Sequence, residues 1–484
     1  MDVESNENQL EMRKPSRAGS REEPDSATPC AETVWRRSTP AHGLILPALP
    51  HIHQLRAHLD GFLPLDNGHH RLFPLLCLSP RSPRLHLNMS AVKEVQTKPF
   101  EGQKPGTSGL RKRVKVFQQQ HYTENFVQAM LDALPGGAKG ATLVLGGDGR
   151  YFSVPAVQAI IRVAAGNGVS KLIIGQNGIL STPAASHAIR KFKANGGILL
   201  TASHNPGGPD NDFGIKLNLS NGGPAPEGVT DDIYKRTTSL TAYHIVEGAD
   251  VDLSKLGAST FADGSFAIEV IDPVKDYIDY LSTIFDFDLI KSFLNDKAHP
   301  FTVRFDALHG VTGPYGRALF VDVFGLPESS IQNCVPSEDF GGGHPDPNLT
   351  YAHSLVEAVE RDSVDFGAAS DGDGDRNMII GAKGTFVNPS DSVAIIAEWA
   401  QRVIPYFKEG GIKGLARSMP TSGAIDLVAK KHGYEFFEVP TGELAFFVPV
   451  RVWKRADVGF HCCVEFRLEV LWQSHGRRPP VHLR

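Results

Sequence analysis

The stretch Gly197-Ile198-Leu199-Leu200-Thr201-Ala202-Ser203-His204-Asn205-Pro206-Gly207-Gly208 joins an apolar run to a loop of small and polar residues. The apolar run is typical of a buried strand end, and the turn-forming residues after it predict a tight, exposed loop. That loop would present Ser203 beside the imidazole of His204. A serine acts as a nucleophile only when it is activated or carries a phosphoryl group. Two interpretations therefore stand: a polar turn capped by Ser and Asn, or a reactive serine.

The residues before this loop alternate between apolar strands and amphipathic helices. We expect strands at 141–146, 171–174 and 197–200, separated by helices at 154–165 and 183–194. This alternation predicts an α/β fold in which helices flank the sheet. Glycines and polar residues follow the strand ends, where open α/β sheets usually bind their ligands.

Two basic positions are candidates for binding an anion. Residues 104–113 form a small-residue loop that ends in Arg111-Lys112-Arg113, before an expected strand at 114–117. The loop is either a solvated turn or an anion site in which Arg111 clamps phosphate or carboxylate. Lys216 lies on a short strand after the serine loop. There, the alternative to a functional lysine is a surface lysine on an edge strand.

A second loop carries the most specific chemistry. Asp371, Asp373 and Asp375 alternate with glycines directly after the apolar run 364–369. Three carboxylates so close together are unfavourable without a cation, and hard oxygen ligands suit Mg²⁺ or Ca²⁺. An EF-hand is excluded because a strand precedes the loop and its twelfth position, counted from Asp371, is Ala382 rather than glutamate. We predict a Mg²⁺ site, with a solvated acidic turn as the alternative.

Composition limits the class of protein. A chain of 484 residues is long enough for several domains, and its net charge of −5 gives no basic surplus that would indicate a nucleic-acid partner. No apolar run is long enough to cross a bilayer, and the polar, acidic start is unlike a secretory signal. Scattered cysteines without metal-ligand spacing predict unpaired thiols in the reducing cytoplasm. They are Cys30, Cys77, Cys334, Cys462 and Cys463.

The two ends of the chain differ in composition from the rest. Residues 1–88 mix Pro, Arg, His and Ser without a sustained period, so we expect them to be disordered, and Met89 would suit a translation start. Residues 443–484 end in a basic, Pro-containing tail. A metal site at His461, Cys462 and Cys463 is not expected because their spacing is wrong. One hypothesis is that both ends are read outside the normal coding frame.

The serine loop and the strand-borne Asp-Gly-Asp-Gly-Asp-Arg loop together resemble the α-D-phosphohexomutase superfamily, and more closely its eukaryotic-type phosphoglucomutases. The resemblance runs from about residue 89 to 442. Further stretches that support it are 102–113, 174–183, 340–350 and 416–422.

The resemblance implies a multidomain α/β architecture with mixed sheets flanked by helices around a central cleft, incomplete at its C-terminal end. We expect domain I at 89–274 with the serine loop and domain II at 275–388 with the aspartate loop. A partial domain III would span 389–442, followed by a divergent tail at 443–484.

The resemblance also implies a reaction, the Mg²⁺-dependent interconversion of glucose 1-phosphate and glucose 6-phosphate. Ser203 would carry the phosphoryl group, and glucose 1,6-bisphosphate would serve as intermediate and activator. The metal ligands would be Ser203, through its phosphate, with Asp371, Asp373 and Asp375. The substrate-binding set would be Arg111, Ser203, His204, Lys216, Asp375, Arg376, Thr441 and Gly442.

Proton transfer in this scheme would fall to His204, Lys216 or Arg111. A general acid–base group is needed because the sugar hydroxyl must lose or gain a proton as the phosphoryl group moves. The implied partner is a hexose phosphate, with no nucleic acid and no membrane. We expect a cytoplasmic monomer that acts in carbohydrate metabolism.

After Gly442 the resemblance stops. The family's Gly-Glu-Glu-Ser-Phe-Gly sugar loop and its fourth domain, which binds the second phosphate, have no counterpart in residues 443–484. Losing groups that orient the substrate is costly in rate, so we expect weak or no turnover from this chain. The alternatives are a catalytically impaired sugar-phosphate-binding protein and a mutase for another hexose or pentose phosphate.

Overall fold

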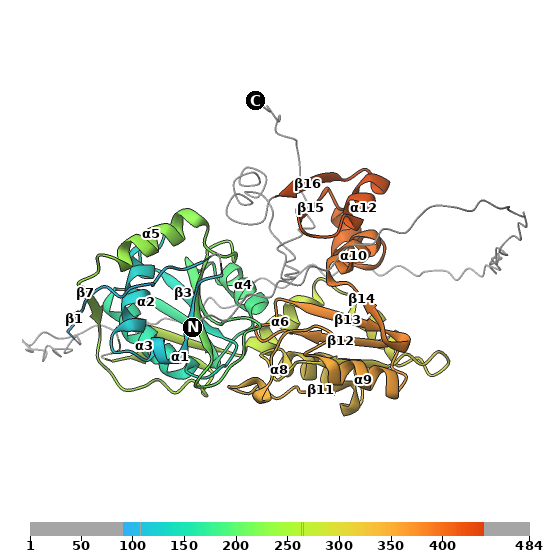
Figure 1. The fold of residues 1–484 in the computed structure, drawn as a ribbon, viewed down its shortest axis with the longest axis horizontal. Coiled ribbons are helices and arrows are strands. Elements are labelled where there is room, and N and C mark those ends of the chain that lie inside the picture. The colour runs from blue at the N-terminus through green and yellow to red at the C-terminus, as the bar shows by residue number, and fades with distance from the viewer. Residues whose placement is uncertain (1–90, 107, 263, 265, 440–484) are drawn as a thin grey trace, which may run out of the picture. The chain divides into compact units, whose positions relative to one another are not determined.

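The computed structural model describes residues 91–439 except 107, 263 and 265 (Figure 1). The expectations for residues 1–88 and 443–484, and the roles of Thr441 and Gly442, lie outside the described residues. So do four of the cysteines, whereas Cys334 is a free thiol. The domain limits expected from the sequence stay predictions.

A seven-stranded mixed sheet, in the order β2-β6-β5-β3-β4-β9-β8, carries the serine loop. Its inner strands β5, β3, β4 and β9 run parallel to one another, while β2, β6 and β8 pair antiparallel. The strands are β2 (Leu110–Arg113), β3 (Thr142–Gly147), β4 (Lys171–Ile179), β5 (Gly196–Leu200), β6 (Asp212–Leu219), β8 (Gly257–Phe261) and β9 (Phe266–Ile271).

Both faces of this sheet are covered by helices, because side chains of its central strand alternate between two buried clusters. Leu143 and Leu145 pack in the cluster that contains the apolar side chains of α2 and α3, whereas Val144 packs in the cluster of α4. A strand buried on both faces reads as a continuous apolar run, as this one does. The helices are α2 (Tyr122–Asp132), α3 (Ser153–Gly166), α4 (Thr182–Lys191) and α5 (Glu227–Thr237).

A five-stranded mixed sheet, in the order β11-β10-β12-β13-β14, carries the aspartate loop. Strand β12 runs parallel to β10 and antiparallel to β13, so the loop joins two neighbouring antiparallel strands (Figure 1). The strands are β10 (Val303–Asp306), β11 (Ile331–Gln332), β12 (Phe366–Ser370), β13 (Asn377–Gly381) and β14 (Thr385–Val387). The helices near this sheet in sequence are α6 (Pro273–Ser282), α7 (Phe287–Leu294), α8 (Gly313–Gly316) and α9 (His353–Arg361).

Two smaller sheets complete the described part of the chain. Strands β15 (Gly414–Ser418) and β16 (Glu435–Val439) pair in parallel. Helices α10 (Pro389–Val403), α11 (Pro405–Gly410) and α12 (Ala424–His432) form a buried cluster with β15. Strands β1 (Lys93–Gln96) and β7 (Ala242–Ile245) form an antiparallel pair.

The strand expected at 114–117 is wrong. The strand comes earlier, as β2, and helix α1 (Val114–Phe117) follows it directly. Val114 and Phe117 are both buried while Lys115 is exposed, which is a spacing of three and hence a helical period. The β-branched residues Val114 and Val116 favour a strand by propensity, but this spacing and the burial that goes with it favour the helix.

Helix α8 continues directly into a π-helical segment, η1 (Arg317–Val323). The amide of Phe324 donates to the carbonyl of Leu319, five residues back, at 3.0 Å. Phe324 is buried in a cluster with Val303 and Leu326.

Among the described residues, no helix combines the length and apolar character needed to cross a bilayer.

Candidate functional site

Ser203 lies beyond the end of β5 and is buried, with only 3% of its surface exposed. The expectation of an exposed loop is therefore wrong for this residue. The reason is that the aspartate loop packs against it: a Cβ atom on Gly372 would lie 2.6 Å from the Ser203 carbonyl oxygen, so only glycine fits there. The Ser203 hydroxyl donates a hydrogen bond to Oδ2 of Asp371 at 2.8 Å. Two loops 168 residues apart in sequence thus meet at the hydroxyl.

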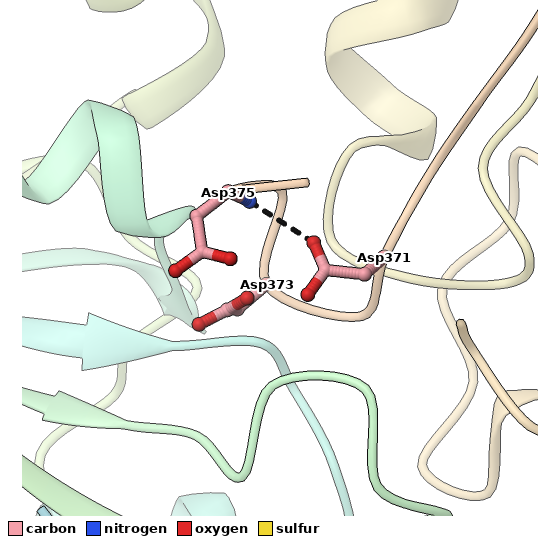
Figure 2. A group of neighbouring side chains, drawn as sticks. All are labelled: Asp371, Asp373 and Asp375. Atoms are coloured by element: carbon pink, nitrogen blue, oxygen red, sulfur yellow. Dashed lines mark hydrogen bonds between the residues drawn. The ribbon is translucent and has the colours of Figure 1, made fainter. Parts of the chain in front are cut away.

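The aspartate loop turns between β12 and β13 and gathers three carboxylates. One oxygen from each of Asp371, Asp373 and Asp375 lies within 4.8 Å of the other two, and Figure 2 shows the three side chains converging inside the turn. Oδ1 of Asp371 accepts the backbone amides of Asp375 and Arg376, each at 3.0 Å. Asp371 and Asp373 are fully buried, while Asp375 is partly exposed.

The electrostatics of this cluster are unfavourable for three anions. Burial, followed by repulsion from Asp373 and Asp375, raises the pKa of Asp371 well above its usual range. Burial and Asp373 raise the pKa of Asp375 to about 7. Burial would also raise the pKa of Asp373, but Lys216, the Thr182 hydroxyl and Arg111 help to bring it below its ordinary value. The cluster therefore needs more positive charge than the described residues supply.

The oxygen ligands that these three aspartates offer fit a divalent cation that prefers oxygen. Oδ1 of Asp373 is buried and has no hydrogen-bond partner among the described residues, so one acceptor of the cluster has no donor to meet it. Closely spaced carboxylates with raised pKa values and an unpaired oxygen are the arrangement that Mg²⁺ or Ca²⁺ neutralises.

Two of the expected cations, Arg111 and Lys216, lie on the neighbouring antiparallel strands β2 and β6 of the seven-stranded sheet. Arg111 lies on β2 opposite Gly214 of β6, and Lys216 lies further along β6. Strand β6 is interior, between β2 and β5, and Lys216 is buried at 9% exposed, so it is no edge-strand surface lysine. Gly109, at φ +84°, lets the preceding loop approach this strand, since a Cβ there would lie 2.8 Å from the Lys216 Cα.

The guanidinium of Arg111 is held near the aspartates without being fully paired. Its Nε atom is buried and has no hydrogen-bond partner among the described residues. Burial is the largest cause of its lowered pKa; Asp373 opposes the shift, and the neighbouring cation Arg376 adds to it. A half-buried guanidinium with a buried, unpaired Nε donor beside other cations is suited to receive an anion.

Arg376 and His204 complete the expected set. Nη1 of Arg376 lies 3.6 Å from the Asp346 carboxylate, and its Nε lies 4.0 Å from Asp371. Nδ1 of His204 lies 3.5 Å from the Ser203 hydroxyl oxygen, at the limit of a hydrogen bond. The structure therefore brings Ser203, His204 and the aspartates together, and Lys216, Arg111 and Arg376 act electrostatically on the same carboxylates.

Sequence reasoning missed three residues around these loops. The Thr182 hydroxyl, at the start of α4, donates to Oδ2 of Asp373 at 2.8 Å, and its amide donates to the Asp373 carbonyl at 2.9 Å. Asp148 and Arg150 form an ion pair whose side chains have 0% exposure, next to Ser203. Their signal was present, because Asp148-Gly149-Arg150 directly follows β3, but no function was assigned to it.

Comparison with known families identifies two parts of the chain. Residues 102–244 match the family model for phosphoglucomutase/phosphomannomutase α/β/α domain I, and residues 275–384 match the model for domain II. The two matches together span just over half of the chain. The serine loop lies in the first match and the aspartate loop in the second.

Individual relatives agree with these matches. A phosphoglucomutase from Schizosaccharomyces pombe is 62% identical over 351 residues, which are 72% of this chain and 62% of that protein. One from Drosophila melanogaster is 57% identical over 355 residues, again 72% of this chain and 63% of the relative. This chain thus spans somewhat less than two thirds of the length of these curated relatives.

A solved structure of high similarity is the exocytosis-sensitive phosphoprotein pp63/parafusin, a phosphoglucomutase from Paramecium. It is 47% identical, with a TM-score of 0.68, and the match covers 73% of this chain and 64% of that one. The mixed sheets flanked by helices are thus those of the phosphohexomutase fold. The chain belongs to the phosphoglucomutase/phosphomannomutase family.

Proposed function

We propose that this chain carries out phosphoryl transfer between Ser203 and a hexose phosphate, as a phosphoglucomutase of the isomerase class. The observation that carries the proposal is the 2.8 Å hydrogen bond from the Ser203 hydroxyl to Asp371. It puts a buried nucleophile against three carboxylates that require a cation. The relatives named phosphoglucomutase support the substrate class.

In the proposed reaction a phosphoryl group moves from the Ser203 oxygen to a hydroxyl of glucose 1-phosphate or glucose 6-phosphate. The serine O–P bond breaks, a sugar O–P bond forms, and the hydroxyl proton passes to a base. The resulting glucose 1,6-bisphosphate returns its other phosphoryl group to Ser203, and the net change is an isomerisation. His204, Lys216 and Arg111 are the candidates for moving the proton.

Positioning and positive charge account for most of the catalysis of such a step. Asp371, Asp373 and Asp375 would hold Mg²⁺ together with the Ser203 phosphate. The metal would neutralise charge on the transferring group. Lys216, Arg111 and Arg376 would bind phosphate oxygens from the protein side, and the hydrogen bonds of Asp371 to two backbone amides keep its carboxylate oriented.

The test is covalent labelling of Ser203. The purified chain is incubated with Mg²⁺ and glucose 1,6-bisphosphate labelled in both phosphates, and the modified residue is located by peptide mass spectrometry. We expect the label on Ser203, and none in Ser203→Ala. Label that persists in Ser203→Ala would refute the assignment of the nucleophile. Binding of the bisphosphate without any label would favour the binding-protein alternative.

The cytoplasmic location and monomeric state expected from the sequence stay predictions.

A further inference from the structure

Arg150 is a fully buried guanidinium that lies next to the serine loop. Its Nη2 donates to the Ser203 carbonyl at 2.8 Å, and its Nη1 donates to the carbonyls of Asn205 at 3.2 Å and Asp212 at 2.9 Å. Its Nε donates to Oδ2 of Asp148 at 2.9 Å. One side chain thus fixes three carbonyls, two of which belong to the serine loop.

A second set of hydrogen bonds joins the ion pair of Asp148 and Arg150 to the backbone amide of Ser203. The Ser203 amide donates to the Thr201 hydroxyl oxygen at 2.7 Å, and the Thr201 hydroxyl donates to Oδ2 of Asp148 at 2.7 Å. Asp148 in turn is paired with Arg150, so the hydrogen bonds form a closed ring through the amide and the carbonyl of Ser203. A ring of this kind constrains the backbone on both sides of the nucleophile.

The constrained backbone is an unfavourable one. Ser203 has φ +55°, in the left-handed region, which costs a residue with a side chain on the order of 1 kcal/mol or more. A residue keeps such a conformation only when its surroundings over-determine it. The ring through Thr201, Asp148 and Arg150 supplies that constraint, and this conformation accompanies the hydrogen bond from the hydroxyl to Asp371.

The same arginine also contacts the side of the site that bears the aspartates. Its guanidinium lies over the ring of Phe340, 5.1 Å from the centroid. Phe340 is buried, five residues before Pro345, whose carbonyl accepts the backbone amide of Gly372 at 3.1 Å. A Cβ on Gly372 would lie 3.2 Å from the Phe340 ring. Arg150 is therefore packed between the serine loop and the segment that supports the aspartate loop.

We propose that Arg150, acting with Asp148 and Thr201, is a positioning residue that holds Ser203 in its left-handed conformation and aims its hydroxyl at the aspartate cluster. None of the three needs to touch the substrate for this role. The inference rests on the proposed function of Ser203, and it adds that the rate of transfer depends on a hydrogen-bond ring behind the nucleophile.

The experiment compares Arg150→Lys, Thr201→Val and Thr201→Ser in the full chain, with Arg162→Lys as the matched control. Arg162 lies on α3, which packs on the same sheet, and pairs with Asp250 instead. The Ser203 labelling rate should fall by roughly a hundredfold in Arg150→Lys and Thr201→Val, because displacement of about an ångström has that effect. The dissociation constant of glucose 1,6-bisphosphate should stay within about threefold, because the phosphate-binding cations are unchanged. Thr201→Ser, which keeps the hydroxyl, and Arg162→Lys should label at the rate of the unchanged chain.

A second measurement keeps the inference testable apart from the reaction. Amide hydrogen exchange of the peptide spanning 201–207 should be faster in Thr201→Val and Arg150→Lys than in Thr201→Ser or Arg162→Lys. Exchange and labelling that are unchanged in Thr201→Val would overturn the inference, even if Arg150→Lys fails to fold. If the unchanged chain takes no label but exchange responds as expected, the proposed function fails and the positioning ring stands.

Discussion

The serine loop and the aspartate loop meet at one hydrogen bond, yet they are stabilised in opposite ways. Around Ser203, the amide, the carbonyl and the hydroxyl all have partners within the chain. In the aspartate loop, Oδ1 of Asp373 has no hydrogen-bond partner among the described residues, and burial and repulsion raise the pKa of Asp371 and Asp375. The first loop is thus positioned by the protein itself, whereas the second is built to be completed by a cation.

The largest effect should come from removing the unpaired acceptor. Asp373→Asn removes the charge of this carboxylate and replaces one of its two oxygens by an NH₂ group, and we expect Mg²⁺ affinity and Ser203 labelling each to fall by more than about a hundredfold. Isothermal titration with Mg²⁺ and the labelling assay check this. Asp362→Asn, on the exposed surface near the same sheet, is the control. Equal Mg²⁺ affinity in the two variants would contradict the conclusion that the aspartate loop, unlike the serine loop, is completed by a cation.

A smaller effect concerns stability as a function of pH. A carboxyl whose pKa is raised on folding destabilises the fold once it ionises, so the contribution of Asp375 to the stability of the metal-free chain should fall as pH rises from the unfolded pKa of about 4 toward its folded value of about 7. Mg²⁺ reverses this by neutralising the carboxylates. The increase in melting temperature on adding Mg²⁺ should therefore be larger at about pH 8 than at about pH 5. A metal-induced increase that is the same at both pH values would contradict the charge argument.

The smallest effect lies at an ion pair remote from both loops. Asp276 of α6 pairs with Lys191 and His187 of α4. Burial would raise its pKa, but these partners lower it overall. A lowered pKa gives stability that is present above the unfolded value and lost as pH falls through the folded one. Asp276→Asn should cost about 1 kcal/mol at neutral pH and almost nothing in acid, measured by urea unfolding. Ser203 labelling should not change.

Much of the fold and of the site could be predicted, because the informative patterns are local. The apolar runs that became β3, β4 and β5, and the helices between them, were read from periodicity. The two loops were found because glycines and polar residues follow strand ends. Strands such as β8 and β13 were not predicted, since a short strand with a mixed pattern acquires its identity from the neighbour with which it pairs.

The burial of Ser203 could not be read from its own sequence, which looks like an exposed turn. It depends on Gly372 approaching from a segment far along the chain. The local pairing of Arg150 with Asp148 is suggested by their spacing, but the role of Arg150 is not, because three of its partners are backbone carbonyls, which carry no sequence signal. The sequence near Lys216 does not show that β6 is an interior strand. Its partner β2 lies about a hundred residues earlier in the chain.

The left-handed backbone at Ser203 also restricts which alcohol can serve at this position. Threonine has a hydroxyl of similar reactivity, but its branched Cβ makes the left-handed region a true steric outlier. Serine tolerates this conformation because it has only one heavy substituent on Cβ. The choice between phosphoserine and phosphothreonine is therefore made by the main chain and not by the chemistry of the phosphate ester.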